Sequence, residues 1–285
     1  MRVVPGLLAT GLLTLYASGA LAGLAADAPG RPRTASAAAS APDLQHRRWT
    51  AVLRANLRDG RVDYATLRRD RTALDAYLAE LEAMDGAAFA RLPPADRLAW
   101  WLNAYNAVVI RTVVEHYPIS GRTLAGLAFP ANSFWQIPGG FRRERVRLLG
   151  RDLSLDDIEH RIVRPEFRDP RIHAAVVCAA LSCPPLRPEA YVGERLDAQL
   201  DEQSRLWIAD ARIGLRIDRE RSRAYVSKIF DWFEEDFAPL ADGNAERGVL
   251  EFVARHTSDP ALAAELRSGR FRVDHLDYDW TLNER

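Results

Sequence analysis

Cys178 and Cys183 are the only cysteines of this 285-residue chain, and they stand five positions apart. His173 opens the same apolar run. Three kinds of chemistry stay open for this set. The cysteines could form a disulfide that closes a small loop. Cys183 could act as a nucleophile with a histidine as base, or His173 and both cysteines could join Glu159 or His160 in a metal site. The spacing fits neither a familiar zinc pattern nor the Cys-x-x-Cys motif, which disfavours a metal site and a redox protein.

Glu159 is the most informative acidic residue. The run Ser154-Leu-Asp-Asp157 is a capping box that predicts the start of a helix. On that helix Glu159 falls about 40° from Leu155, inside the apolar face. A carboxylate on a buried face has a raised pKa or a dedicated partner. Glu159 is therefore a general acid/base, an orienting residue for a catalytic histidine, or one half of a buried ion pair with an arginine.

Two amides lie on the helix predicted over Asp96–His116. That helix is apolar nearly all round, which is typical of a buried helix. Asn103 and Asn106 fall on one of its apolar flanks, where side-chain amides need hydrogen-bond partners. They are either structural brackets for a loop or donors that stabilise an oxyanion.

Three further side chains are candidates for contact with a substrate: Tyr105, Trp135 and Lys228. Lys228 is the only lysine of the chain, so its site could require a compact ammonium, either for an anionic substrate or for a structural ion pair. Large aromatic side chains at helical or alternating spacing usually pack in the core. That is the favoured interpretation for Trp232 and Trp280, and it competes with the substrate role of Tyr105.

The elements that must position these residues do not alternate regularly. Helices are predicted over 49–57, 66–84, 96–116, from 154, 196–207, 229–237 and 246–256, and hairpins over 141–152 and 213–226. Ile172–Val177 reads as a short buried strand with His173 and Cys178 on opposite faces, and 271–280 as a C-terminal strand. This pattern predicts one α+β domain of helices packed on short antiparallel hairpins. With a cysteine nucleophile, the fold would be cysteine-protease-like or transglutaminase-like.

Residues 1–26 have the features of an export signal: Arg2, a long apolar stretch, and small residues at Ala20 and Ala22 for cleavage. An uncleaved membrane anchor is the less favoured alternative. Residues 27–43, rich in Ala, Pro and Ser, predict a disordered linker, and 44–285 a single globular domain. We therefore expect a periplasmic or secreted protein with no stable membrane span after cleavage. The 39 basic and 39 acidic residues form no basic stripe, which argues against nucleic acid as a partner.

Five motifs occur in order along the chain: Trp101-Leu-Asn-Ala-Tyr-Asn-Ala107, Ser154 to His160, His173 to Leu186, Ser227-Lys-Ile-Phe230 and Tyr278-Asp-Trp-Thr-Leu-Asn283. Together they resemble the domain-of-unknown-function 547 family over roughly residues 49–283. The resemblance implies that the motif residues form one shared site or core, and it implies no reaction. His256 and His275 lie outside the motifs, so His173 is the expected base.

The leading functional hypothesis is an exported thiol-dependent hydrolase or acyl transferase acting on a peptide, cell-envelope or thiol-conjugate amide. Cys183 would be the nucleophile, His173 the base, Glu159 the acid or orienting residue, and Asn103 and Asn106 donors to the developing charge. The alternative is a non-enzymatic ligand-binding or scaffold module in which the two cysteines are bridged. A small-molecule or peptide ligand is expected in either case, with no cofactor and no metal.

Overall fold

The structure is a computed structural model that describes residues 42–285 except 122 and 125. The predicted export signal and all of the predicted linker before Pro42 lie outside the described residues. Pro42–Arg285 cluster into one unit, in which helices and small sheets form the predicted α+β domain.

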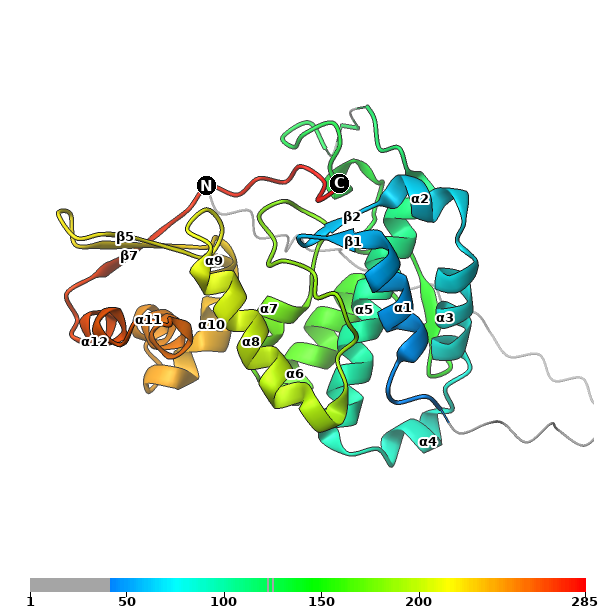
Figure 1. Ribbon diagram of the computed structural model, residues 1–285, viewed down its shortest axis with the longest axis horizontal. Coiled ribbons are helices and arrows are strands. Elements are labelled where there is room, and N and C mark those ends of the chain that lie inside the picture. Colours follow the sequence, from blue (N-terminus) through cyan, green and yellow to red (C-terminus); the bar gives the residue numbers. More distant parts are fainter. Residues whose placement is uncertain (1–41, 122, 125) are drawn as a thin grey trace, which may run out of the picture. The chain divides into compact units, whose positions relative to one another are not determined.

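One long helix, α5 (Pro94–His116), organises the first half of this unit (Figure 1). It begins at a proline, where the missing N–H costs little, and it ends before Tyr117-Pro118. Every residue from Leu98 to Ile110 is buried, as the all-round apolar sequence predicted. Shorter helices precede it in the chain: α1 (Arg47–Asn56), α2 (Tyr64–Arg69), α3 (Thr72–Glu82) and α4 (Gly86–Ala90). The strands β1 (Leu57–Arg58) and β2 (Arg61–Val62) form a small hairpin after α1.

The single helix predicted over 66–84 is in fact two helices, α2 and α3. Asp70 takes an extended backbone conformation, with φ −140° and ψ 102°. Its carboxylate Oδ1 accepts the N–H of Thr72 at 3.0 Å. This local side-chain bond competes with the helical hydrogen bonds and separates the two helices.

The middle of the chain carries short elements: η1 (Phe134–Gln136), β3 (Val146–Leu148), β4 (Arg151–Leu153), η2 (Asp157–Val163), α6 (Arg164–Phe167), α7 (Ile172–Ala175), η3 (Gly193–Arg195) and α8 (Leu196–Ala209). The predicted capping box is confirmed. Ser154 Oγ accepts the N–H of Asp157 at 3.1 Å, and Asp157 Oδ2 accepts the N–H of Ser154 at 3.0 Å. The helix that follows is a π-helix, which the sequence did not predict.

The prediction of a strand over Ile172–Val177 is wrong. Ile172–Ala175 form the helical turn α7, and the N–H of Val176 donates to the carbonyl of Ile172 at 2.9 Å. A short apolar run can be a buried strand or a buried helical turn, and periodicity alone does not separate the two. The argument that alternation puts His173 and Cys178 on opposite faces of a strand therefore does not apply.

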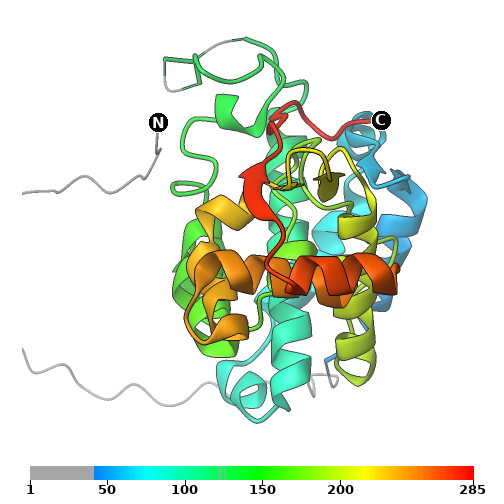
Figure 2. The same ribbon diagram turned by 90° about the vertical axis from the view of Figure 1, so that its left-hand side faces the viewer.

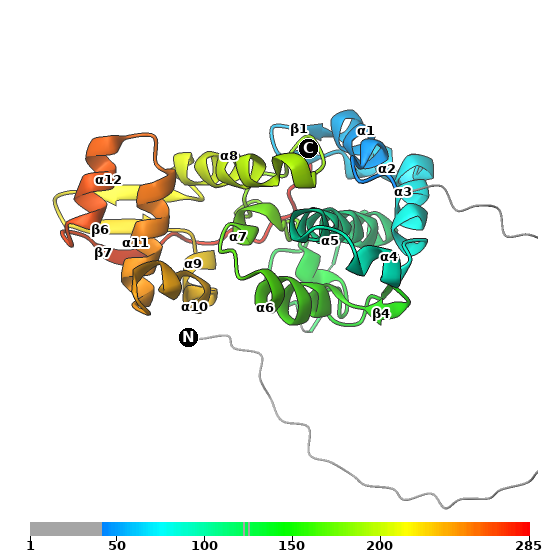
Figure 3. The same ribbon diagram turned by 90° about the horizontal axis from the view of Figure 1, so that it is seen from below.

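The last third of the chain combines a small sheet with helices: β5 (Leu215–Asp218), β6 (Arg223–Val226), α9 (Ile229–Trp232), α10 (Glu234–Phe237), η4 (Ala238–Ala241), α11 (Ala245–His256), α12 (Pro260–Arg267) and β7 (Arg272–His275). The strands β5 and β6 pair antiparallel, as predicted, and β7 adds a parallel strand beside β6. The helices α11 and α12 lie beside this sheet (Figure 3). The helix predicted over 229–237 breaks at Phe233, and the C-terminal strand is shorter than predicted.

Beyond β7 the chain leaves the sheet and crosses to the N-terminal helices (Figure 2). Leu282 bridges to Ala180, and Glu284 bridges to Val62. The hydroxyl of Tyr64 donates to Asn283 Oδ1 at 2.7 Å. Residues 100 or more positions apart thus meet around the cysteine segment. No helix within the described residues is long and apolar enough to cross a membrane.

Candidate functional site

Both predicted amides of α5 hold backbone segments of neighbouring loops. Asn106 Nδ2 donates to the carbonyl of Ala175 at 2.9 Å, while its Oδ1 accepts the N–H of Val177 at 3.0 Å. Asn103 makes the same pair of bonds with one residue, Tyr191, at 2.7 and 2.9 Å. Asn103 is 0% exposed and Asn106 is 3% exposed. Of the two roles left open by the sequence, the geometry favours structural brackets over oxyanion donors.

The segment that Asn106 holds carries the two cysteines. Cys178 and Cys183 form a disulfide, and no free cysteine occurs in the described residues. The hydroxyl of Tyr278 lies 3.3 Å from Cys178 Sγ and 3.2 Å from Cys183 Sγ. Cys183 is only 4% exposed. The sulfur pair is therefore held between α5 and the C-terminal segment.

Residues 279–283 fix Tyr278 against the disulfide. The N–H groups of Leu181 and Ser182 donate to the carbonyls of Thr281 and Asp279, at 2.8 and 3.2 Å. Ser182 Oγ accepts the N–H of Asp279 at 2.9 Å. This strand-like pairing places the Tyr278 hydroxyl beside both sulfur atoms.

Glu159 lies on the π-helix η2, and its side chain is 12% exposed. Its Oε2 accepts the hydroxyl of Tyr105 at 2.8 Å. Burial, and after it the negative charge of Glu159, raises the pKa of Tyr278. A π-helical turn shifts the angular position of its residues and is frequent at functional sites. Glu159 thus joins η2 to α5 through Tyr105.

The dedicated partner of Glu159 is a tyrosine rather than an arginine. Tyr105 is 2% exposed, so a ligand cannot lie against its ring as the sequence hypothesis required. Burial, followed by the charge of Glu159, raises the pKa of Tyr105 well above its usual value. Tyr105 is therefore a neutral donor that positions the carboxylate.

His173 pairs with an aspartate that the sequence did not single out. Its Nε2 lies 2.7 Å from Asp236 Oδ2, and its ring stacks on Phe233 with centroids 4.4 Å apart. Arg164 Nε donates to the same Asp236 oxygen at 2.6 Å. Burial alone would raise the pKa of Asp236, but the hydrogen bonds from His173 and Arg164 lower it to about 2. In the described residues His173 makes no hydrogen bond to either sulfur atom, so the predicted cysteine–histidine pair is not formed here.

Partly exposed aromatic rings gather next to Tyr278. We name the set Phe129, Trp135, Trp232, Tyr278 and Trp280 the aromatic surface. Trp232 and Trp280 stack at 5.3 Å, Tyr278 contacts both rings, and Trp135 meets Trp280 edge-on at 5.6 Å. Trp232 is 40% exposed, which corrects the expectation that it packs in the core. None of the five is fully buried.

Lys228 lies at the start of α9, four residues before Trp232. Its Nζ lies 2.8 Å from Asp231 Oδ2, and its side chain is 37% exposed. The structural ion pair that the sequence left open is therefore present. Contact with an anionic substrate stays a prediction.

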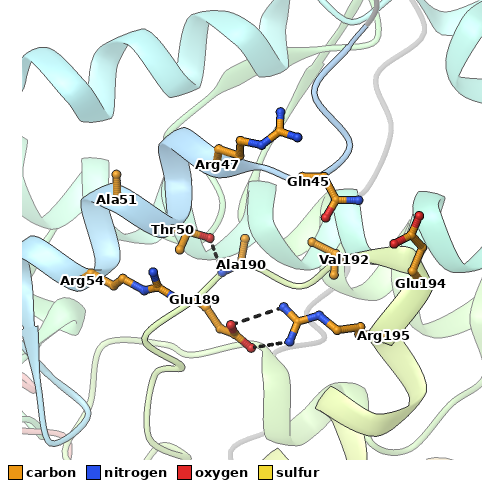
Figure 4. A pocket seen from close by; sticks show the side chains of 10 residues that line it. All are labelled: Gln45, Arg47, Thr50, Ala51, Arg54, Glu189, Ala190, Val192, Glu194 and Arg195. Atoms are coloured by element: carbon orange, nitrogen blue, oxygen red, sulfur yellow. Dashed lines mark hydrogen bonds and ion pairs between the residues drawn. The ribbon is translucent and has the colours of Figure 1, made fainter.

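A solvent-open hollow lies elsewhere, between α1 and the segment that leads into α8 (Figure 4). It is open to solvent, has a volume of about 630 Å³, and is lined by Arg47, Arg54 and Arg195 together with Glu189. Burial would raise the pKa of Glu189, but hydrogen bonds from Arg187, Gln199 and Arg195 lower it to about 2. None of the predicted site residues lines this hollow.

Within residues 42–285, apart from 122 and 125, no group of three or more His, Cys, Asp or Glu side chains is placed to hold a metal ion. The ring of His160 comes near Glu159, with Nδ1 4.0 Å from Oε1. The ligands considered from the sequence therefore form no such group in this part of the chain.

Sequence reasoning missed Asp236, Phe129 and the exposure of Trp232. One signal was available, because Trp232 stands in a run of acidic residues, Asp231 and Glu234 to Asp236, which is unusual for a core position. The pairing of His173 with Asp236 joins residues 63 positions apart and leaves no local signature.

Comparison with known proteins finds a similarity to one family model over part of the chain, and no activity. Residues 89–208 match the family model described as "Protein of unknown function, DUF547". No curated protein and no solved structure matches the chain. The matched segment contains the motifs of Asn103, Glu159 and the cysteines, while Lys228 and Tyr278 lie beyond it. The match over residues 89–208 makes this part of the chain similar to the DUF547 family, which the motifs had indicated.

Proposed function

We propose that this protein is an exported, non-enzymatic ligand-binding module that takes up a small molecule or a peptide at the aromatic surface. The observation that carries the proposal is the 40% exposure of Trp232 in a cluster of mutually contacting rings. Aromatic side chains provide large, rigid contact area at low conformational cost and are enriched in binding sites. A ring this exposed contributes little to the core, so a ligand that covers it would gain apolar burial.

The polar groups beneath the rings support the same role. Tyr278 belongs to the aromatic surface through its ring and contacts both sulfurs through its hydroxyl. Glu159 has one oxygen bonded to Tyr105, and its side chain keeps 12% exposure. A few fixed polar groups beside an apolar contact area are typical of ligand sites, where they orient the ligand.

The thiol-dependent hydrolase or acyl transferase has less support. It needs a free thiolate at Cys183, and this sulfur is bonded to Cys178 and buried. Its expected base, His173, is engaged with Asp236. Its expected amide donors hold the backbone at Ala175, Val177 and Tyr191. In this proposal the disulfide is a structural bridge, and disulfides persist in exported proteins because those compartments are oxidising.

The test is a fluorescence titration of the full-length, oxidised protein with a panel of envelope-derived small molecules and short peptides. A ligand of the aromatic surface changes tryptophan emission, and Trp232→Ala weakens its binding. Leu206→Ala is the matched control, because Leu206 is also an exposed large apolar residue, at 58%, and it lies on α8. Ligands whose affinity is unchanged by Trp232→Ala would remove the support for this surface.

A second measurement separates binding from thiol catalysis. We expect the non-reduced protein to have a mass two hydrogens below that of the reduced chain and to resist alkylation by iodoacetamide until it is reduced. Rapid alkylation of Cys183 at a pH well below the ordinary thiol pKa, together with turnover lost in Cys183→Ala, would instead establish the hydrolase.

A further inference from the structure

The charge around the aromatic surface is unlike that of the chain as a whole, which has 39 basic and 39 acidic residues. The two segments that carry Trp232, Tyr278 and Trp280 run over residues 228–236 and 274–280. They hold one lysine, Lys228, and seven carboxylates: Asp231, Glu234, Glu235, Asp236, Asp274, Asp277 and Asp279. A neutral chain therefore concentrates negative charge beside its exposed rings.

Only some of these carboxylates are neutralised by neighbouring cations. Lys228 pairs with Asp231, and Arg164 pairs with both Glu235 and Asp236. In the described part of the chain, no salt bridge engages the remaining four: Glu234, Asp274, Asp277 and Asp279. Glu234, Asp277 and Asp279 are also exposed. Asp277 and Asp279 flank Tyr278 in the chain, and Asp279 adjoins Trp280.

The ring geometry leaves room for a ligand on Trp232. Trp280 stacks against it with an interplanar angle of 21°, which covers one face of the indole. Tyr278 also meets this ring, with centroids 4.8 Å apart, yet Trp232 keeps 40% exposure, so part of the residue is open to solvent. The negative face of an indole attracts cations, and nearby carboxylates add to the same potential.

We infer that the ligand of the aromatic surface carries an organic ammonium group, which lies over Trp232 and is attracted by Asp277 and Asp279. This inference rests on the proposed function and names the chemical class of its ligand. The ammonium could belong to a small molecule or to a lysine side chain of a peptide. The shared chemistry is a positively charged, partly apolar group, which gains both ring contact and charge attraction.

The experiment compares charged and neutral probes of equal shape on the full-length, oxidised protein by tryptophan fluorescence. Choline is paired with 3,3-dimethylbutan-1-ol, its neutral carbon isostere. A blocked tri-lysine peptide is paired with the same peptide acetylated on each lysine. A cation–π contact at an exposed site predicts about 2- to 5-fold tighter binding of the charged member.

Variants assign that preference to the named residues. Trp232→Ala removes the preference for the charged probe. The double variant Asp277→Asn/Asp279→Asn reduces the ratio of the two affinities toward unity. Leu206→Ala and Glu82→Gln are controls, since each changes an exposed apolar or acidic residue on a different element, and both keep the preference.

The outcomes are distinct. A preference for choline alone identifies a small ammonium compound, and a preference for both charged probes identifies a basic peptide segment; either supports the inference. Equal binding of charged and neutral probes, weakened by Trp232→Ala, overturns the cationic ligand and leaves the proposed function standing. Binding of any probe that Trp232→Ala leaves unchanged contradicts both. If none of the four probes binds, the ammonium ligand is rejected, and the wider panel of the preceding subsection decides the proposed function.

Discussion

Asn106→Ala tests whether the α5 amides are structural brackets. The Asn106 amide satisfies two buried backbone groups, the carbonyl of Ala175 and the N–H of Val177, whose residues are 1% and 4% exposed. Each buried polar group left without a partner costs about 1–3 kcal/mol, so the substitution should lower the free energy of unfolding by about 2–6 kcal/mol. For a domain of this size the melting temperature falls by roughly 2–4 °C per kcal/mol, which gives a drop of about 8–16 °C for a loss of 4 kcal/mol.

The assay is urea denaturation of the oxidised protein followed by far-ultraviolet circular dichroism. Asn56→Ala is the matched control, because Asn56 is only partly buried and its amide makes one local bond, to the carbonyl of Val52 at 2.9 Å. We expect that variant to lose no more than about 1 kcal/mol. If Asn106→Ala also lost less than about 1 kcal/mol, the bracket would contribute little to the free energy of unfolding. The role as an oxyanion donor, which the sequence left open, would then be favoured again.

Three further predictions concern stability. Replacing both Cys178 and Cys183 by serine should lower the free energy of unfolding by about 2 kcal/mol in the chain-entropy model for a loop this short, measured in urea. Burial lowers the pKa of His46 to about 4, so between pH 6.5 and 4 the unfolded chain takes up the proton first. Stability should therefore fall by roughly 3 kcal/mol across that window as the pH drops, and His46→Asn should abolish this dependence in urea titrations at each pH. Tyr105→Phe leaves Glu159 without its donor and should cost about 1.5–3 kcal/mol. Glu159→Gln keeps an acceptor for that hydroxyl and should cost less, and a reversed order would show that the charge itself is what the fold requires.

The helix α5 could be predicted closely because its signals are local. Its proline start, its all-round apolar sequence and its Tyr-Pro end all lie within or next to the helix. The hairpin β5–β6 and the capping box at Ser154 are equally local. The π-helix η2 could not be predicted, because the apolar face of this segment was calculated with the α-helical angle per residue. That calculation cannot show where an α-helical turn widens into a π-helical one. The segment from Ile172 was ambiguous because six apolar-rich residues fit a strand or a helical turn.

The site depended on contacts that no local pattern records. The Tyr278 hydroxyl reaches Cys178 across 100 positions because residues 279–283 pair with the cysteine loop. His173 was expected to act as the base for a cysteine because it lies within the family motifs, whereas in the fold its partner is Asp236. The residue types therefore indicated which side chains belong to the site, whereas contacts between distant segments of the chain determined the partner of each side chain.

These partners are also the reason why we propose that the cysteines support binding rather than form a reactive site. A nucleophilic thiol needs an accessible sulfur and a base that can take its proton. Cys183 has a covalent bond to Cys178 and a phenol beside it, and burial raises the pKa of that phenol, so Tyr278 is a poor base at neutral pH. A binding surface needs the opposite properties, namely fixed rings and an unreactive support. The bridge meets that need because it holds the loop against which Tyr278 is positioned, and Tyr278 in turn packs against Trp232 and Trp280.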